Sequence, residues 1–256
     1  MLNKKSREIR GMFASIAHRY DLLNRLLSFS QDRRWRRVCS RKLQDLLPGP
    51  AVVLDLCAGT GDLAIELSRQ NRVVACDFCH PMLVLGQRKV QAVGRSGIIR
   101  FVEGDALQLP FSSGCFDGVT IAFGLRNLPD YLEGLREMHR VLRAGGTLAV
   151  LEFSQPQFPV LKQLYSFYCM RVLPRIGQRL SGEKGPYSYL PQSVREFPDP
   201  QKLETIIRQA GFTSLRHYKL TAGIVTLHLA QNSTDCGMGA KGWLAAWDVT
   251  DRLPCG

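Results

Sequence analysis

One stretch, residues 52–64, constrains the fold of this chain more than any other. It begins with β-branched valines, which favour a strand that is buried on both faces. Asp55 follows near the strand end, and Gly59 and Gly61 then permit a tight turn that a ligand can approach closely. A helix starting at Asp62 would point its free N–H groups at that ligand. The stretch therefore predicts a strand, a glycine turn and a helix that together bind a small molecule.

The spacing of this turn is compatible with two kinds of cofactor. Gly59-x-Gly61-x-x-Ala64 fits the dinucleotide fingerprint, and it equally fits an S-adenosylmethionine loop. Asp55 is an anion beside the turn, so it suits a cationic group or a hydrogen-bond donor rather than a phosphate.

Two further acidic residues discriminate between these cofactors. Asp77 follows a second apolar run, and an acid at that place binds ribose hydroxyls in either class. Asp105 and its small neighbour Ala106 follow a third run and suit an adenine amino group. Acids at three successive strand ends favour S-adenosylmethionine. Three solvated turn residues are the plain structural alternative.

Beyond this stretch the chain alternates between strand and helix patterns, which predicts a mostly parallel sheet covered by helices on both faces. Residues 214–220 and 224–229 form a closing hairpin, so we expect a seven-stranded Rossmann-like α/β domain with an antiparallel edge strand. This domain spans residues 1–230, and residues 231–256 are expected to form a poorly ordered tail. The other strands are predicted near 52–56, 73–76, 98–102, 117–122 and 146–152, and helices near 62–69, 80–93 and 131–143.

Several helix boundaries can be predicted from capping residues. Asp130 precedes a helical stripe and Glu133 follows three residues later, as in a capping box. Gly145–Gly146 is expected to end that helix. Asp199 followed by Pro200 predicts the start of a later helix. Residues 154–198, between these helices, read as a helical insertion that contacts the acceptor.

The N-terminal segment, residues 3–47, reads as basic and helical. Its apolar stripe indicates a helix packed on the domain, or a lid over the cofactor lined by polar side chains. Arg33–Arg37 is its densest charge cluster. The polar lining of the lid would come from His18, Tyr20, Asp21 and Asn24.

The net charge of +12 is concentrated near the N-terminus, where residues 1–50 hold twelve Lys/Arg against four Asp/Glu. Nucleic acid, an anionic membrane surface and a plain solvated face are all compatible with this charge. No apolar run approaches the roughly 18 residues of a membrane span. The basic N-terminus is a poor signal peptide, so a cytoplasmic protein is expected.

Cys76-x-x-Cys79 has metal or redox spacing, but no second pair accompanies it and Asp77 lies inside it, so no metal site is expected.

Several motifs together resemble one family, the ubiquinone/menaquinone biosynthesis C-methyltransferases, over about residues 13–230. The run Phe123-Gly-Leu-Arg-Asn127 with its flanking blocks is more specific than the glycine turn. The other matching blocks are Phe13-Ala-x-Ile-Ala17-x-x-Tyr20-Asp21-Leu-Leu-Asn24, Leu27-Ser28…Arg34-Trp35-Arg36, Leu54–Leu63, Asp77–Leu83, Leu151-Glu152-Phe153-Ser154-x-Pro156, Tyr187–Pro198 and Thr221–His228.

The resemblance implies a class I S-adenosylmethionine methyltransferase that methylates a ring carbon of a prenylated quinol. Conversion of demethylmenaquinol to menaquinol is favoured, and a benzoquinol of ubiquinone biosynthesis remains open. Family cofactor contacts carry over onto Thr60, Asp77 and the pair Asp105–Ala106. The family often has Ser at the position of Ala122, so no side-chain contact is assigned there.

Methyl transfer to carbon requires alignment of donor and acceptor, and an acceptor whose ring hydroxyl is ionised. A quinol resembles a phenol, whose pKa is about 10, so the site should stabilise an oxyanion or remove a proton. Arg126 and Asn127, just past the fourth strand, are the catalytic candidates. In the alternative, Arg126 pairs with a carboxylate and only holds the loop. His18, Asp21 and His228 are candidate bases, each with a packing or capping alternative.

The expected partners follow from the same considerations. A polyprenyl quinol resides in the bilayer, so Arg33–Arg37 is a candidate for peripheral docking at the inner, anionic membrane face. No nucleic-acid partner is expected, because an Asn-Pro-Pro-Tyr-like motif is missing and the thiols form no catalytic motif. A nicotinamide oxidoreductase and a non-enzymatic membrane-surface scaffold are the remaining alternatives, and a homodimer is left open.

Overall fold

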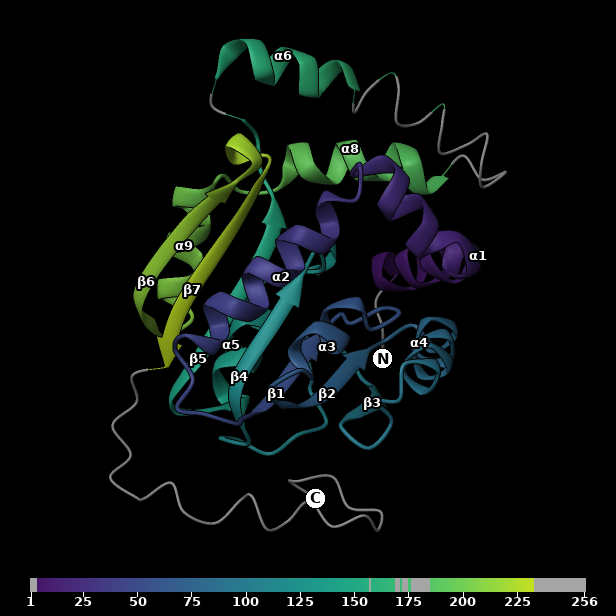
Figure 1. Cartoon of the computed structure of the whole chain (residues 1–256). Coiled ribbons are helices and arrows are strands. Elements are labelled where there is room, and N and C mark those ends of the chain that lie inside the picture. The colour runs from purple at the N-terminus through teal and green to yellow at the C-terminus, as the bar shows by residue number, and fades with distance from the viewer. Residues whose placement is uncertain (1–3, 157, 169–170, 172–174, 176–184, 233–256) are drawn as a thin grey trace.

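The computed structural model describes residues 4–156, 158–168, 171, 175 and 185–232. Its centre is a seven-stranded sheet in the order β3-β2-β1-β4-β5-β7-β6 (Figure 1). β1 to β5 are parallel, β7 is antiparallel to β5, and the edge strand β6 pairs antiparallel with β7. The predicted mostly parallel sheet with antiparallel pairing at one edge is confirmed. The strands are β1 (Val52–Leu56), β2 (Arg72–Asp77), β3 (Ile99–Glu103), β4 (Phe116–Ala122), β5 (Leu142–Phe153), β6 (Phe212–Leu220) and β7 (Val225–Asn232).

Helices cover both faces of this sheet and produce two buried cores. Leu54 of β1 packs in the core beneath α5 and α9, whereas Val53 packs in the core beneath α2, α3 and α4. Because successive strand residues point to opposite faces, Asp55 lies on the same face as Val53. The helices are α1 (Lys4–Leu27), α2 (Gln31–Gln44), α3 (Asp62–Leu67), α4 (His80–Ala92), α5 (Tyr131–Val141), α6 (Pro159–Phe167), α8 (Gly185–Glu196) and α9 (Pro200–Gln209), with 3₁₀ turns at Leu125–Asn127 and Thr221–Gly223.

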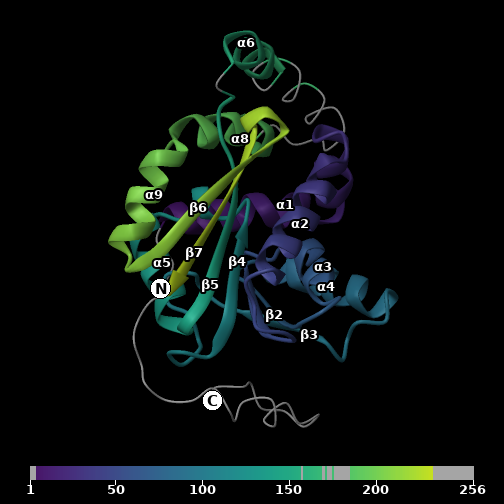
Figure 2. The same ribbon diagram turned by 60° about the vertical axis from the view of Figure 1, so that its left-hand side comes forward.

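The strand order places a ligand crevice at the carboxyl end of β1. From β1 the chain continues to β2 and β3 on one side, and it then crosses to β4 on the other side of β1. A ligand crevice opens where the strand order reverses in this way. α1, α8 and α6 gather beyond the carboxyl ends of the strands, with α6 outermost (Figures 1 and 2). The segment predicted as a helical insertion contributes α6 and α8 to this end of the molecule.

The structure confirms two predicted helix starts and corrects one helix end. Asp130 accepts a hydrogen bond from the Glu133 N–H (3.0 Å), and Asp199 accepts one from the Lys202 N–H (2.9 Å). The prediction that Gly145–Gly146 ends α5 was wrong. α5 ends at Val141, since Leu142 already pairs with Phe116 of β4, and both glycines lie in an irregular part of β5.

The last described strand extends beyond residue 230, where the domain was expected to end. β7 runs to Asn232 and so includes residues 231 and 232, which were assigned to the tail. The rest of that segment, residues 233–256, lies outside the described residues. Within the part of the chain that is described, no helix is both long and apolar enough to cross a membrane.

Gly124 offers a test of how closely the β4 loop packs on the glycine turn. A Cβ at Gly124 would overlap the Cβ of Cys57, which is itself held at a left-handed φ of 55°. We expect Gly124→Ala to lower the free energy of unfolding by about 1–3 kcal/mol through overpacking. Cys57→Gly in the same chain should restore most of that loss, because it removes the overlapping atoms. Urea denaturation of the single and double variants measures this. If Gly124→Ala and the double variant were equally stable, the close packing of Gly124 on Cys57 would be contradicted.

Candidate active site

The glycine turn after β1 depends on two residues in left-handed conformations. Gly59 has φ 55° and Gly61 has φ 78°, a region that side chains rarely adopt. Gly61 is the N-cap of α3, and a Cβ there would come within 3.1 Å of the Phe101 ring. Gly61 therefore shapes the turn and the start of α3, whereas Gly59 lines the ligand side.

Asp77, at the tip of β2, holds this turn in place. Its carboxylate accepts hydrogen bonds from the backbone N–H groups of Gly59 (2.8 Å) and Cys79 (2.9 Å). Burial raises the pKa of Asp77 to about 6, although these hydrogen bonds favour the charged form. Cys76 and Cys79 on either side of Asp77 are buried free thiols.

Two small hollows adjoin the turn and share Tyr20, Cys57, Gly59 and Ala122 as lining residues. The first, called the acidic hollow, is bordered by Asp77, Asp105 and Ala106. The second, called the glycine-loop hollow, is bordered by Arg36, Asp55, Thr60, Asp62 and Leu63. The structure thus brings the three predicted acids to two adjoining spaces.

Asp55 carries the observation that best fits a bound ligand. It is buried, and the Thr120 hydroxyl donates to Oδ1 (2.9 Å), while Oδ2 is buried without a partner among the described residues. Burial raises the pKa of Asp55 to about 7. A buried carboxylate oxygen without a partner is costly, so an amino group placed there would stabilise it. This arrangement fits S-adenosylmethionine, whose amino-acid end carries an ammonium group.

α1 is fastened over the turn by a small polar network. The Thr60 hydroxyl donates to Asp21 of α1 (2.6 Å), Lys89 of α4 donates to the other Asp21 oxygen (2.6 Å), and Lys89 also pairs with Asp62. Thr60, a predicted cofactor contact, therefore uses its hydroxyl within the protein. Asp21, a candidate base, is engaged in the same network, and His18 is exposed on α1.

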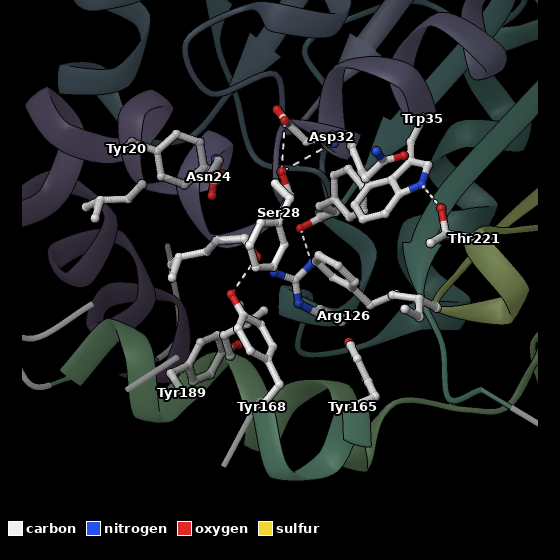
Figure 3. A pocket seen from close by; sticks show the side chains of 18 of the residues that line it. Tyr20, Asn24, Ser28, Asp32, Trp35, Arg126, Tyr165, Tyr168, Tyr189 and Thr221 are labelled. Atoms are coloured by element: carbon white, nitrogen blue, oxygen red, sulfur yellow. Dashed lines mark hydrogen bonds between the residues drawn. The ribbon is translucent and has the colours of Figure 1, made fainter. Parts of the chain in front are cut away.

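A larger cavity of about 350 Å³ lies beside these hollows. Its walls are mainly apolar and aromatic, and they come from α1, α2, α6, α8, the loop after β4, the end of β5 and the turn between β6 and β7. Figure 3 shows the Arg126 guanidinium among the side chains that surround it. Tyr20 lines this cavity and both hollows, so it lies where they meet. The other lining residues include Phe13, Ile16, Leu23, Asn24, Ser28, Phe29, Asp32, Trp35, Arg36, Phe123, Phe153, Leu164, Tyr165, Tyr168, Tyr189 and Leu190.

Arg126 reaches this cavity from a buried ion pair. Its Nη1 donates to Glu152 Oε1 (2.8 Å) and to the Phe123 carbonyl, while its Nε is buried without a partner among the described residues. The Arg126 backbone N–H also donates to Glu152 (3.3 Å). The pairing with a carboxylate that the structural alternative predicted is therefore present, and the same side chain lines the cavity.

Asn127 connects the cavity wall to the acidic hollow. The Tyr189 hydroxyl of α8 donates to Asn127 Oδ1 (3.0 Å), and Asn127 Nδ2 lies 3.4 Å from the Phe123 carbonyl. Asn127 lines the acidic hollow and Tyr189 lines the larger cavity. α8 thereby orients the Asn127 amide at the boundary of the two spaces.

Two sequence expectations do not match the geometry. His228 lines none of these spaces; it is buried under α9, where Nε2 bonds the Pro200 carbonyl (3.2 Å) and burial lowers its pKa to about 4. The Arg33–Arg37 cluster is divided, because Trp35 and Arg36 are buried at the cavity. Trp35 donates to the Thr221 hydroxyl (2.8 Å), so the helical period of α2 turns it inward.

Sequence reasoning missed three residues that shape the site: Glu152, Tyr189 and Arg36. Tyr20 was predicted to line a lid over the cofactor, but its place at the meeting point of the three spaces was not. Glu152 and Tyr189 occur within motif blocks, but nothing in their spacing indicated that they contact Arg126 and Asn127. A charged residue among apolar strand residues, as Glu152 is in β5, was the available signal.

A glycine turn at the switch point, acids at successive strand ends and an adjoining apolar cavity define a methyltransferase that uses S-adenosylmethionine. Solved structures share this fold: the [4+2]-cyclase SpnF has a TM-score of 0.64 at 15% identity, covering 89% of this chain and 96% of its own. A methyltransferase from Thermotoga maritima, described as a possible histamine N-methyltransferase, has a TM-score of 0.60 at 16% identity, covering 87% and 99%. These identities show the fold alone.

The chain belongs to the ubiE/COQ5 methyltransferase family, whose model matches residues 1–232. It is 47% identical over 232 residues to the ubiquinone/menaquinone biosynthesis C-methyltransferase of Geobacter sp. (strain M21), covering 89% of this chain and 97% of the relative. It is 48% identical over 223 residues to the demethylmenaquinone methyltransferase of Thermus thermophilus, covering 85% and 98%. Membership in this family decides against the nicotinamide oxidoreductase and the non-enzymatic scaffold.

The pKa of Asp55 makes the stability of the ligand-free protein depend on pH. The folded pKa of about 7 exceeds the ordinary 3.8, so between these values the folded state binds more protons than the unfolded state. The contribution of Asp55 to stability therefore falls as pH rises through this window. We expect Asp55→Asn to flatten the decline in unfolding free energy between about pH 4 and pH 7 relative to the unmodified protein. Urea denaturation at a series of pH values measures this, with Asp45→Asn, which changes an exposed carboxylate, as the control. If the unfolding free energies of Asp55→Asn and the unmodified protein changed in parallel with pH, the prediction would be contradicted.

Proposed function

We propose that this protein transfers the methyl group of S-adenosylmethionine to a ring carbon of a prenylated quinol, with demethylmenaquinol as the acceptor. The observation that carries this proposal is the 350 Å³ apolar cavity that meets the cofactor hollows at Tyr20. A cavity of this size and lining suits an aromatic ring with an isoprenoid chain. The names of the relatives support the same acceptor class, and they include both menaquinone and ubiquinone biosynthesis.

The chemistry assigns distinct tasks to the cofactor and to the protein. S-Adenosylmethionine supplies an electrophilic methyl group on a sulfonium sulfur. The protein must hold the ring carbon in line with that methyl group and favour the ionised ring hydroxyl. The ring hydroxyl would give its proton to water, and the ring carbon would then bond the methyl carbon as the methyl–sulfur bond breaks and leaves its electron pair on sulfur. The hydrogen on that ring carbon would leave to water as a proton, which restores the aromatic ring.

Arg126 is the residue best placed to stabilise the ring oxyanion. Its guanidinium stays charged and borders the cavity, and Glu152 and the Phe123 carbonyl orient it. Asn127, oriented by Tyr189, is the second polar group at this boundary. Among the described lining residues the sole carboxylate is Asp32, and it accepts hydrogen bonds from Ser28 (2.9 Å) and Arg36 (2.6 Å). The proposal therefore depends on stabilisation of the anion.

Arg126→Gln combined with Glu152→Gln tests this role while removing both members of the buried pair. Loss of the cation should lower kcat by at least about tenfold, as removal of one oxyanion donor does. The affinity for S-adenosylmethionine should change little. Arg126→Lys, which keeps a charge, should retain more activity than the double variant. A double variant that folds, binds cofactor and turns over normally would contradict the assignment.

The ring of the acceptor can be assigned by a direct comparison. We expect demethylmenaquinol to be methylated with a higher kcat/KM than a demethylated benzoquinol that carries the same prenyl chain. Mass detection of the methylated product measures both reactions. A preference for the benzoquinol would reassign the substrate and leave the role of Arg126 intact.

The proposed membrane contact keeps only part of the arginine cluster that the sequence favoured and adds an apolar surface to it. Five large apolar side chains, called the apolar rim, are each more than half exposed; four belong to α6 or its N-cap, and the fifth lies between α1 and α2. Two of them, Phe29 and Leu164, also line the cavity. Exposed Arg33 and Arg34 follow Phe29 at the start of α2. The rim consists of Phe29, Phe158, Val160, Leu164 and Phe167.

This combination fits a peripheral position on an anionic bilayer, from which a quinol could enter the cavity. Rim side chains would insert among the lipids, and the exposed arginines would face the headgroups. Trp35 and Arg36 take no part, because both are buried.

Phe158→Ser with Phe167→Ser tests the apolar rim. Loss of two inserted rings should weaken binding to phosphatidylcholine–phosphatidylglycerol vesicles by about fivefold or more in sedimentation. Val93→Ser, which changes an exposed apolar residue after α4, should have no effect. Arg33→Gln with Arg34→Gln should reduce binding to anionic vesicles alone. No sedimentation of the unmodified protein with these vesicles or with vesicles of phosphatidylcholine alone would remove this proposal.

A further inference from the structure

Three side chains that can ligate a metal ion come together beneath α9, apart from the spaces described above. They are Glu204 of α9, His217 of β6 and His228 of β7, and none of them lines the acidic hollow, the glycine-loop hollow or the larger cavity. One donor atom of each residue lies within 4.8 Å of the other two. Glu204 and His217 are 13 residues apart, so no ligand motif marks them in the sequence.

The edge of the sheet and α9 together assemble this group. His217 lies directly opposite His228 in the antiparallel register of β6 and β7, so both side chains belong to one face of the hairpin. Their ring centres are 5.6 Å apart. α9 packs on this hairpin (Figure 2), and Glu204 accepts a hydrogen bond from His217 Nδ1. Three separate elements therefore each contribute one potential ligand.

His228 provides the observation that points to a ligand. It is 2% exposed, and its Nδ1 is buried without a hydrogen-bond partner among the described residues. Its Nε2 lies 3.2 Å from the Pro200 carbonyl, which can only accept, so the ring hydrogen is assigned to Nε2. Burial disfavours the charged ring, so Nδ1 carries a lone pair. A histidine that binds a metal commonly donates its other ring N–H to a backbone carbonyl in this way.

The donor set selects the kind of cation. Two imidazoles and one carboxylate suit Zn²⁺, whereas Mg²⁺ and Ca²⁺ prefer oxygen ligands. Zinc ligands lie about 2.0–2.2 Å from the ion, so one ion joins donors about 4 Å apart, and small side-chain rotations cover the remaining distance. The side chains of His217 and Glu204 are 25% and 26% exposed, which leaves access for the ion and for a water as fourth ligand.

We propose that Glu204, His217 and His228 form a zinc-binding site that fastens α9 to the β6–β7 hairpin. The ion takes the lone pair of His228 Nδ1 and replaces the hydrogen bond between His217 and Glu204. It stabilises the folded chain and takes no part in methyl transfer, because its ligands line none of the spaces around Tyr20. This inference is therefore independent of the proposed acceptor and of the cofactor.

Zinc binding to the unmodified protein is the first test. Protein treated with EDTA and then desalted is titrated by calorimetry with zinc chloride and, for comparison, with magnesium chloride. We expect one zinc ion per chain and an affinity for magnesium that is at least about 100-fold lower. At a zinc concentration of about 100 times the Kd, the melting temperature should rise by about 5 °C or more. Absence of zinc binding would overturn the proposal.

Variants then assign the ion to these residues. His217→Gln and Glu204→Gln change the two partly exposed ligands and leave the buried His228 in place, so they disturb folding least. Each should weaken zinc binding by about tenfold or more and remove the zinc-induced rise in melting temperature. Circular dichroism without zinc reports on the fold of each variant. Zinc affinity that neither substitution changes would overturn the proposal.

His80→Gln is the matched control for these variants. His80 also pairs with one carboxylate, that of Glu103 (2.9 Å), but this pair is exposed and belongs to no group of three ligands among the described residues. The substitution should leave the zinc affinity unchanged. A loss of affinity equal to that of His217→Gln would show nonspecific binding to surface histidines and would contradict the proposed site.

Cobalt(II) in place of zinc identifies the ligand atoms, which matters because the chain contains eight cysteines. A site of nitrogen and oxygen ligands should give visible d–d absorption without the near-ultraviolet charge-transfer band of a cobalt–thiolate bond. A strong thiolate band at one equivalent of cobalt would assign the ion to cysteines and would overturn the proposal. None of these measurements depends on methyl-transfer activity.

Discussion

Six charged side chains are buried at or beside the carboxyl ends of the strands, and removal of each charge from water costs several kcal/mol unless a partner compensates. Among the described residues they are Asp32, Arg36, Asp55, Asp77, Arg126 and Glu152. Two cation–carboxylate pairs, Arg126–Glu152 and Arg36–Asp32, account for four of them. Asp77 is compensated by two backbone N–H groups, which at the same time hold the glycine turn. This compensation fixes the positions of the loops that form the site.

Asp55 is the member of this set whose compensation is incomplete. Oδ1 accepts from Thr120, while Oδ2 is buried without a hydrogen-bond partner among the described residues, and burial raises the pKa to about 7. A protein keeps such a residue at a cost in stability, and a bound cationic ligand can offset that cost. Stability without ligand and affinity for the cofactor are therefore expected to oppose each other at this position.

The larger cavity is formed by parts of the chain that are distant in sequence. α1 and α2 precede the sheet, α6 and α8 follow β5, and Arg126 lies on the loop after β4. Tyr168 of the later segment donates to the Leu27 carbonyl at the end of α1 (2.8 Å), which ties the two walls together. α6, which carries most of the apolar rim, lies at the same end of the molecule (Figure 1).

The sequence alone determined the parallel sheet, the glycine turn and the placement of acids at three strand ends. These depend on local spacing: β-branched runs, glycines that permit positive φ, and capping residues such as Asp130 and Asp199. Family motifs added Thr60, Arg126 and Asn127. Such patterns show which residues occur at the end of a strand. Because the carboxyl ends of parallel strands lie at one edge of the sheet, these residues are expected to lie near one another.

The tertiary structure decided which partner each of these residues has. Glu152, 26 positions after Arg126, pairs with it because β4 and β5 lie side by side, and no local pattern encodes that pairing. Packing of α2 on the sheet buried Trp35 and Arg36 out of a cluster that looked uniformly exposed, and α9 covered His228. Charge in a sequence shows only what must be solvated or paired, and long-range packing selects which of the two occurs.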